Sequence, residues 1–334
     1  AKSQNGQVFQ NLMGIICSEE NIQLAYRNIK RNGGSVTPGV DGITIRDIEQ
    51  MPAEKYIRTV QKKLAWYKPK PVKRVEIPKP NGGIRPLGIP TMFYRLVQQS
   101  IKQVLEPICE AKFHEYSYGF RPNRSAENAI SKVQNLIHFT KLYYVVDMDI
   151  KGFFDNVNHS KLIKQMWSLG IRDKTLLCII KEMLKAPIIL PDGSKVLPQK
   201  GTPQGGLLSP LLSLIVLNEL DWWVSSQWET FQPKNRSKNG WLQYAKKYTK
   251  LKSGFIVRYA DDFKIMCSTY GEAQRFYHST VDFLNKRLKL EISPEKSKVV
   301  NLKKNSSDFL GFKIKVIPKG RTKHGYVAKT DMNQ

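Results

Sequence analysis

Two adjacent carboxylates, Asp261 and Asp262, stand between two apolar runs, 255–259 and 263–267. Aspartate is unfavourable inside a strand, so a tight turn between two strands would explain the position of both residues. Such turns usually contain Gly or Asn, however, and the residue before the pair is Ala260. Because neighbouring carboxylates repel each other unless a cation lies between them, the pair is either a plain turn or part of a metal site.

A third carboxylate is supplied by the strand-like segment 142–149. With a period of two, Asp147 and Asp149 lie on the face opposite the apolar residues of that segment. Asp149 ends the strand, where a ligand-binding side chain is well placed, whereas Asp147 is equally consistent with a solvated charge and with a supporting role. Asp155 lies close before a predicted helix, so a cap or loop role is favoured for it.

One carboxylate at a strand end and two on a hairpin turn match the ligands that Mg²⁺ prefers, which are hard carboxylate and phosphate oxygens. We expect Asp149 and Asp261 to be the direct ligands, assisted by the backbone carbonyl of Ile150, and Asp262 to lie nearby in a weaker role. Two such ions would stabilise the attacking and leaving oxygens of an in-line displacement. The expected cofactor is therefore two Mg²⁺ ions, with Asp149, Asp261 and Asp262 as catalytic residues.

The elements that must position these residues follow from apolar periodicity and from turn residues. Helices are predicted over residues 19–31, 53–66, 92–110, 125–139, 159–168, 172–185, 209–223 and 271–290. Strands are predicted in a hairpin at 72–77 and 84–89, over 142–149, in a second hairpin at 255–267, and around 297–302, 309–316 and 325–329. This mixture of elements predicts an α+β fold.

The charge balance indicates a polyanionic partner. The chain has 54 Lys and Arg against 28 Asp and Glu, a formal net charge of +26, whereas small domains ordinarily carry about 2–8 charges of either sign. Nucleic acid is the expected partner. The basic and aromatic segment 228–253 is interpreted as a surface insertion, equally consistent with a nucleic-acid contact and with a solvated loop. No apolar run is long enough to span a membrane, and the four cysteines are widely spaced, so neither a membrane nor a disulfide framework is expected.

Several motifs resemble, in family order, those of the reverse transcriptases encoded by group II introns, the maturases. Tyr259-Ala260-Asp261-Asp262 resembles their motif C, the stretch 149–155 their motif A, and Pro203-Gln204-Gly205-Gly206-Leu-Leu-Ser-Pro their motif B. The stretches 39–42, 74–90, 118–125 and 309–312 are similar to further family motifs, from the end of the N-terminal extension to the late palm. The ordered set runs from about residue 20 to about residue 330 and is far more specific than the tetrad alone.

The resemblance implies the fingers and palm of a right-hand polymerase, with an antiparallel palm sheet packed on helices and a helical N-terminal extension. The expected domains are the N-terminal extension with an RNA-binding loop (1–58), the fingers (59–140) and the palm (141–334). Residues 156–200 are expected to return partly to the fingers, and 228–253 to be inserted. The thumb that follows the palm in this family is not in the chain, so a fragment of a longer protein is expected.

The same resemblance implies roles for individual residues. Lys79 and Arg85, on the fingers hairpin, should hold the incoming triphosphate, although a solvated basic hairpin is the alternative. Phe154 should pack under the sugar and exclude a 2′-OH, unless it is plain core. Gln204 and Gly205 should approach the nucleotide and the templating base, because glycine permits close backbone contact. Contacts to template, primer or RNA are expected for four further residues, Arg121, Arg124, Tyr259 and Gly311, with a structural, ion-paired role equally open for each arginine.

The function implied is that of an RNA-directed DNA polymerase that extends a primer with deoxynucleoside triphosphates (dNTPs) and also binds its intron RNA to assist splicing and mobility. The expected partners are group II intron RNA, template RNA, a DNA primer or target, and dNTPs; a homodimer is left open. The expected location is the bacterial cytoplasm, with the nucleoid or a ribonucleoprotein. The alternatives are an RNA-binding splicing factor without polymerase activity, and a related diversity-generating or CRISPR-associated reverse transcriptase. An RNA polymerase on the same palm is disfavoured, because Phe154 leaves no room at the sugar.

Overall fold

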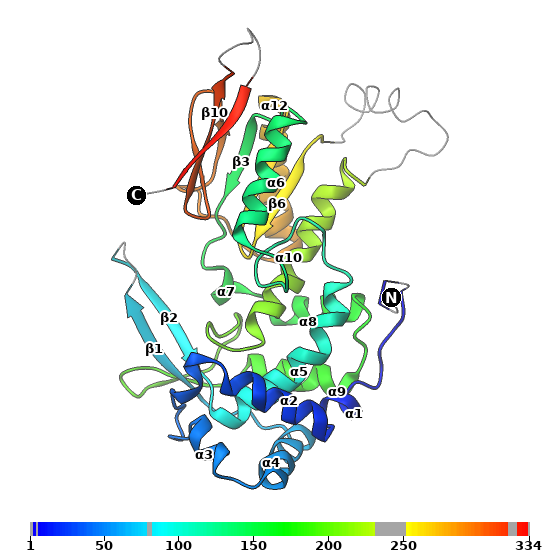
Figure 1. Cartoon of the computed structure of the whole chain (residues 1–334), viewed down its shortest axis with the longest axis vertical. Coiled ribbons are helices and arrows are strands. Elements are labelled where there is room, and N and C mark those ends of the chain that lie inside the picture. The colour runs from blue at the N-terminus through cyan, green and yellow to red at the C-terminus, as the bar shows by residue number, and fades with distance from the viewer. Residues whose placement is uncertain (1–2, 5, 79–81, 231–251, 320–325, 333–334) are drawn as a thin grey trace. The chain divides into compact units, whose positions relative to one another are not determined.

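The computed structural model describes residues 3–4, 6–78, 82–230, 252–319 and 326–332 (Figure 1). Lys79 and most of the segment 228–253 lie outside the described residues, so the expectations placed on them have no structural counterpart here. The chain forms two compact units. The first contains residues 1–112 and 154–215, and the second contains residues 113–153 and 216–334. Residues 113–140, grouped above with the expected fingers, therefore fold with the second unit.

The first unit consists of helices that pack on one another and a small four-stranded sheet. Its helices are α1 (Met13–Ile16), α2 (Glu19–Lys30), η1 (Gly33–Val36), α3 (Ile45–Glu49), α4 (Ala53–Ala65), α5 (Met92–Glu110), α8 (His159–Ser168) and α9 (Lys174–Leu184). Its strands are β1 (Val72–Pro78), β2 (Ile84–Ile89), β4 (Ile188–Ile189) and β5 (Lys195–Val196), in the order β2-β1-β4-β5. The hairpin of β1 and β2 is antiparallel, as the sequence predicts.

The second unit is built on a four-stranded antiparallel sheet in the order β6-β7-β3-β8. Its strands are β3 (Tyr144–Met148), β6 (Phe255–Tyr259), β7 (Asp262–Cys267) and β8 (Lys298–Asn301). A three-stranded sheet contains β9 (Ser307–Phe309), β10 (Phe312–Pro318) and β11 (Tyr326–Met332). The helices are α6 (Ala126–His138) and α12 (Tyr270–Phe283), which continues into the π-helical turn η2 (Leu284–Leu288). Helices α7 (Phe153–Asn156) and α10 (Ser209–Ser226) each include residues of both units.

Capping side chains set where several of these helices begin. Ser125 and Asn128 form a capping box at the start of α6, and Thr269 and Glu272 form one at the start of α12. In each box, a side chain at either end satisfies a backbone N–H that has no partner within the helix. The predicted starts of these two helices lie within a residue of the observed ones.

The main sheet of the second unit is covered on both faces, which corrects the single apolar face predicted for the strand at 142–149. Val145, Val257 and Met266 pack with α6 and with the three-stranded sheet in one buried cluster, and the three-stranded sheet lies beside α6 in Figure 1. Helix α12 packs on β3, β7 and β8. Val145 is buried because the face that it shares with Asp147 is also packed.

Two predicted elements differ from the structure near the C-terminal end. The strand expected at 309–316 is interrupted by Leu310 and Gly311, whose φ angles of 53° and 83° turn the chain between β9 and β10. Two consecutive positive φ values are typical of a two-residue hairpin turn. The helix expected to reach residue 290 leaves α-helical geometry after Phe283 and ends at Lys289, with φ 60°. Among the described residues, no helix is both long and apolar enough to cross a membrane.

Candidate active site

The turn between β6 and β7 carries two of the three predicted catalytic carboxylates. The last residue pair of this hairpin joins Tyr259 to Asp262, so Ala260 and Asp261 form the turn itself. Ala260 has a φ of 56°, a left-handed conformation that is uncommon for residues other than glycine. The turn contains no Gly or Asn, and Ala260, directly before Asp261, adopts the left-handed conformation in their place.

Asp149 reaches the same end of the sheet from the neighbouring strand. Strand β3 pairs with β7 so that Met148 lies opposite Phe263, and one further step in this register brings Asp149 opposite Asp262. The backbone N–H of Asp149 donates to Ser297 Oγ at 3.2 Å, and its carbonyl accepts from the Ser293 N–H at 2.8 Å. The main chain at Asp149 is therefore held by the loop that precedes β8.

Ile150 is held in a way that leaves its carbonyl facing away from this loop. It forms an isolated antiparallel bridge with Ile292. The bonds of the bridge are made by the flanking residues, with the Lys151 N–H donating to the Glu291 carbonyl at 2.9 Å and the Ser293 N–H to the Asp149 carbonyl at 2.8 Å. In such a non-hydrogen-bonded pair, the central residues direct their own N–H and C=O groups outward. The Ile150 carbonyl is thus available as a ligand.

A buried lysine lies under the carboxylates. Lys264 is opposite Asp147 in the β3–β7 register and forms an ion pair with it, and Asp147 also accepts from Ser307 Oγ at 2.8 Å. The Lys264 ammonium lies 3.8 Å from Asp262. Burial raises the pKa of Asp262 to about 6, with Lys264 opposing and the neighbouring aspartates adding to the rise. The role of Asp147, which the sequence leaves open, is therefore that of the partner of a buried cation.

The oxygen ligands at this end of the sheet suit a hard cation. The side chains of Asp149 and Asp262 are 48% and 42% exposed, and an exposed ammonium, that of Lys296, lies 3.8 Å from Asp149. In the described part of the chain, no three His, Cys, Asp or Glu side chains are close enough together to hold a metal ion by themselves. Mg²⁺ is ordinarily bound by one or two carboxylates together with substrate phosphates and water, so two carboxylates with the Ile150 carbonyl would suffice.

The carboxylate turn is supported by residues that the sequence analysis did not single out. Arg258 is fully buried and pairs with Asp221 of α10, its Nε donating to Asp221 Oδ1 at 2.8 Å. Its Nη1 donates to the Ala260 carbonyl at 2.6 Å. Gly119 packs so closely that an added Cβ would lie 2.2 Å from the Ala260 nitrogen. The signal in the sequence was an arginine inside an apolar strand, which is unusual unless the charge is paired.

The described residues that are expected to bind the nucleotide lie in the first unit. The Phe154 carbonyl accepts from the Thr202 N–H at 2.6 Å, and the Val157 carbonyl from the Gly201 N–H at 2.7 Å. Gly201 has a φ of 93°, and an added Cβ would touch the Asp155 backbone at about 2.9 Å. The stretch that resembles motif A is thereby joined to the residues directly before the loop that resembles motif B. Phe154 itself is half-buried.

That loop is also joined to the fingers-like hairpin. The Gln204 carbonyl accepts from the Gly88 N–H of β2 at 2.5 Å. Gly205, at φ 98°, lies so close to β2 that an added Cβ would be 2.6 Å from Leu87 and 2.8 Å from the Gly88 carbonyl. Arg85 is exposed on the same strand. Within the first unit, Phe154, Gln204, Gly205 and Arg85 thus belong to segments that are bonded to one another.

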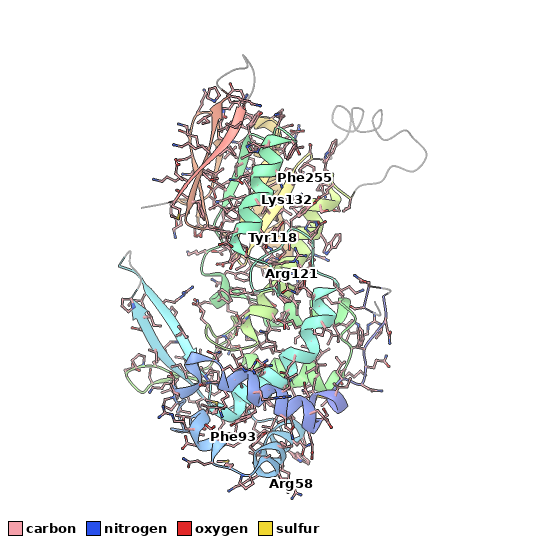
Figure 2. The ribbon with its side chains drawn as sticks, in the orientation of Figure 1. Arg58, Phe93, Tyr118, Arg121, Lys132 and Phe255 are labelled. Carbon is pink, nitrogen blue, oxygen red and sulfur yellow. The ribbon has the colours of Figure 1, made fainter. Side chains whose placement is uncertain are left out.

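The four residues expected to contact template, primer or RNA all lie in the second unit. Arg121 is buried, donates to the carbonyls of His114 and Ser117 at 2.6 and 2.7 Å, and lies over the Phe113 ring. These contacts engage its guanidinium inside the protein; Figure 2 labels the residue. Arg124 is partly exposed and donates to the Glu115 carbonyl. Tyr259 ends β6 beside the carboxylate turn, and Gly311 forms the β9–β10 turn.

Comparison with known proteins places the chain in a family. The profile of the family described as reverse transcriptase (RNA-dependent DNA polymerase) matches residues 77–314. The chain therefore belongs to the reverse transcriptase family. The fingers and the palm are the parts of such a polymerase that we expect in this chain.

The relatives are consistent with the group II intron resemblance and confirm that prediction. Protein YkfC of Escherichia coli (strain K12) is 31% identical over 91% of this chain and 83% of its own length. Group II intron-encoded protein LtrA of Lactococcus lactis subsp. cremoris is 32% identical over 98% of this chain and 60% of its own length. The putative COX1/OXI3 intron 1 protein of Saccharomyces cerevisiae is 29% identical over 92% of this chain. The chain spans 40% of that protein, so it covers less than two thirds of two of these three relatives.

Proposed function

We propose that this chain is the polymerase part of a group II intron-type reverse transcriptase, an RNA-directed DNA polymerase that extends a primer 3′-OH with dNTPs. The single observation that carries the proposal is the convergence of Asp149 and the Asp261–Asp262 turn at one end of the β3–β7 pair. A sequence-separated carboxylate set at one sheet end has no evident structural purpose, since its members repel one another. The family membership of the chain supports the same reading.

The chain's own residues would act chiefly by positioning. Asp149 and Asp261, with the Ile150 carbonyl, would hold two Mg²⁺ ions, and Asp262 would contribute from nearby. When bound, these ions supply charge stabilisation for the attacking and leaving oxygens of an in-line displacement. The nucleophile is the primer 3′-OH, so no nucleophilic side chain is required of the protein.

The nucleotide would be held by residues of the first unit. Arg85 offers a planar fork for phosphate oxygens, and Lys79 offers a point charge. Phe154 would pack beneath the sugar, and Gln204 with Gly205 would face the nucleotide and the templating base. The bonds between their segments support this grouping, because a residue that orients a substrate must itself be held.

Intron and template RNA would be bound through the basic charge and the N-terminal segment. A cavity in the first unit is lined by Asn32, Ser35 and Thr37 of the η1 segment together with Gly205 and Leu207. This cavity links the expected RNA-binding extension to the motif B-like loop. We assign the N-terminal extension and much of the fingers to the first unit, and the palm sheet to the second. By the same reasoning we assign the chain a role in splicing and mobility of its intron.

The decisive test is extension of a DNA primer on an RNA template with dNTPs and Mg²⁺. Asp261→Ala with Asp262→Ala should abolish extension while leaving RNA binding intact. Asp282→Ala is the matched control, because it removes an exposed carboxylate of α12 that pairs with Lys286 in a helical i, i+4 contact. Extension that survives the double substitution would refute the metal assignment. RNA binding by a wild-type chain that never extends a primer would instead favour a splicing factor without polymerase activity.

A further inference from the structure

Arg258 is a charged residue at a fully buried position, where an apolar side chain would be expected. It lies in β6 between Val257 and Tyr259 and is 0% exposed. Its ion pair with Asp221 is equally buried, with both side chains 1% exposed. A buried ion pair often stabilises a fold no more than apolar residues of similar volume, because both charges lose their hydration. The presence of Arg258 therefore calls for a reason other than stability.

A third hydrogen bond of the guanidinium suggests the reason for a charged residue at this position. After Nε and Nη2 have paired with Asp221, Nη1 donates to the Ala260 carbonyl at 2.6 Å. That carbonyl belongs to the peptide that joins Ala260 to Asp261. The bond fixes the orientation of this peptide while Ala260 is in the left-handed region, where an alanine does not stay without support. Arg258 thus bonds to the peptide group that precedes Asp261.

The main chain around the guanidinium is held as firmly as the side chain. The Arg258 carbonyl accepts from the Tyr118 N–H at 2.8 Å, and its N–H donates to the Tyr116 carbonyl at 2.9 Å. On its other edge β6 pairs with β7, with Arg258 opposite Phe263. Tyr118 is followed by Gly119, whose backbone lies against Ala260. The turn is therefore braced from the 116–119 segment and from α10.

We infer that the Asp221–Arg258 pair is a positioning device that sets the geometry of the Asp261 turn for metal binding. This inference rests on the proposed function and adds to it two residues that touch neither substrate nor metal. One requirement, a fixed geometry of the Asp261 turn, explains three observations. They are the buried charge of Arg258, the strain at Ala260 and the close packing of Gly119. A metal ligand on a short turn is useful only when its direction is set before the ion arrives.

The test is Arg258→Lys. Lysine keeps a positive charge beside Asp221 but lacks the planar fork that reaches Asp221 and the Ala260 carbonyl together. We expect the Mg²⁺ concentration for half-maximal primer extension to rise about tenfold or more, the scale seen when residues behind metal ligands are altered. Excess Mg²⁺ should recover much of the rate. Arg287→Lys is the matched control, because Arg287 pairs with Glu219 of the same helix α10 but is exposed.

A second variant keeps the inference testable where Arg258→Lys weakens the fold. Ala260→Gly leaves the ion pair intact and removes the strain, so it should not lower the melting temperature, yet it frees the turn and should also raise the Mg²⁺ requirement. The inference is overturned when both variants need no more Mg²⁺ than the wild type, or when Arg258→Lys loses stability and activity together at an unchanged Mg²⁺ requirement. A wild-type chain that fails to extend any primer refutes the proposed function instead. Direct titration of the wild-type and variant proteins with Mn²⁺ then still decides whether Arg258 sets metal affinity.

Discussion

At the scale of single residues, Asp262 is set apart from its two partners by its surroundings. Burial raises its pKa to about 6 even though Lys264 lies 3.8 Å away. Because a metal ligand must be deprotonated, the site should lose metal affinity as the pH falls through 6. We expect the Mg²⁺ requirement for extension to rise between pH 7.5 and pH 5.5, and to rise less in Asp262→Asn. An equal pH dependence of the Mg²⁺ requirement in both proteins would show that protonation of Asp262 is not its cause.

The same shift has a consequence for stability in EDTA. The folded-state pKa lies above the ordinary value of about 3.9 for Asp, so the folded protein binds the proton more tightly than the unfolded chain does. Protonation therefore stabilises the fold, and this contribution is lost as the pH rises from about 4 through 6. Asp262→Asn should be more stable than the wild type at pH 7 and equal to it near pH 4. The side chain is 42% exposed, so the gain should be at most about 1 kcal/mol. Chemical unfolding at the two pH values measures it.

Phe154 carries the prediction on sugar selectivity. Its backbone is bonded to Thr202, and its side chain is half-buried, so part of the ring remains accessible to a ligand. Phe154→Ala should admit ribonucleotides and lower the preference for dNTPs at least tenfold, the scale set by a lost steric contact in a specificity pocket. Phe139→Ala removes an 83% exposed ring and is the control. The preference for dNTPs over ribonucleotides is measured by extension with each nucleotide alone. An unchanged preference would mean that Phe154 is only a core residue.

At the residue level, the sequence is informative where the alternation along a single strand is enough. Strand alternation predicts that Asp147 and Asp149 share one face, and the structure sets Asp147 opposite Lys264 in a strand that ends at Met148. The partner of Asp147 could not be foreseen, because Lys264 reaches it only through the register of β3 with β7. Arg121 was open between two roles, and its burial became known only from the fold around His114 and Ser117.

At the scale of elements, the close approach of the motif B-like loop to β2 supports a prediction at Gly205. Its φ of 98° and its contact with Leu87 and the Gly88 carbonyl allow no side chain. Gly205→Ala should lower the free energy of unfolding by about 2 kcal/mol and reduce extension more than that loss alone explains. Gly193→Ala is a matched control, since Gly193 has a φ of 83° with nothing within 4 Å of an added Cβ. Equal effects of the two substitutions would mean that backbone strain, and not the contact with β2, is responsible.

Helix boundaries were predictable from caps, whereas the turn at Leu310 was not. Ser125 and Thr269 mark helix starts with side chains whose purpose is local. Leu310 adopts a φ of 53° although nothing in its side chain favours it. The reversal is imposed by pairing of β9 with β10, a tertiary contact that an apolar run around Gly311 does not reveal.

At the scale of the whole molecule, the net charge of +26 predicts how RNA binding responds to salt. Each phosphate neutralised by Lys or Arg releases condensed counterions, at about 0.7 per contact for single strands. For six or more contacts, the affinity should fall at least about a hundredfold between 50 and 200 mM salt. Filter binding with a single-stranded RNA over that range is the measurement. A nearly flat response would show that the basic charge does not contact the phosphates.

The division of the chain into two compact units depends on contacts between segments that are distant in the sequence. The family resemblance suggested fingers over 59–140 and a palm over 141–334, with 156–200 returning partly to the fingers. Compactness groups 113–153 with 216–334, because Tyr116 and Tyr118 bond to β6 and α6 packs on the sheet. Such long-range pairings leave no mark in local periodicity.

Because each unit is assembled from two separated stretches of chain, the order of synthesis constrains the order of folding. The first unit lacks Gly201, Gln204 and the rest of 154–215 until these have left the ribosome, although its first 112 residues emerge much earlier. Strand β3 likewise waits for β7 and β8, which lie more than a hundred residues later in the chain. During translation, apolar surface of both units is therefore exposed at the same time, and the nascent chain should depend on chaperones more than a protein of two consecutive domains would.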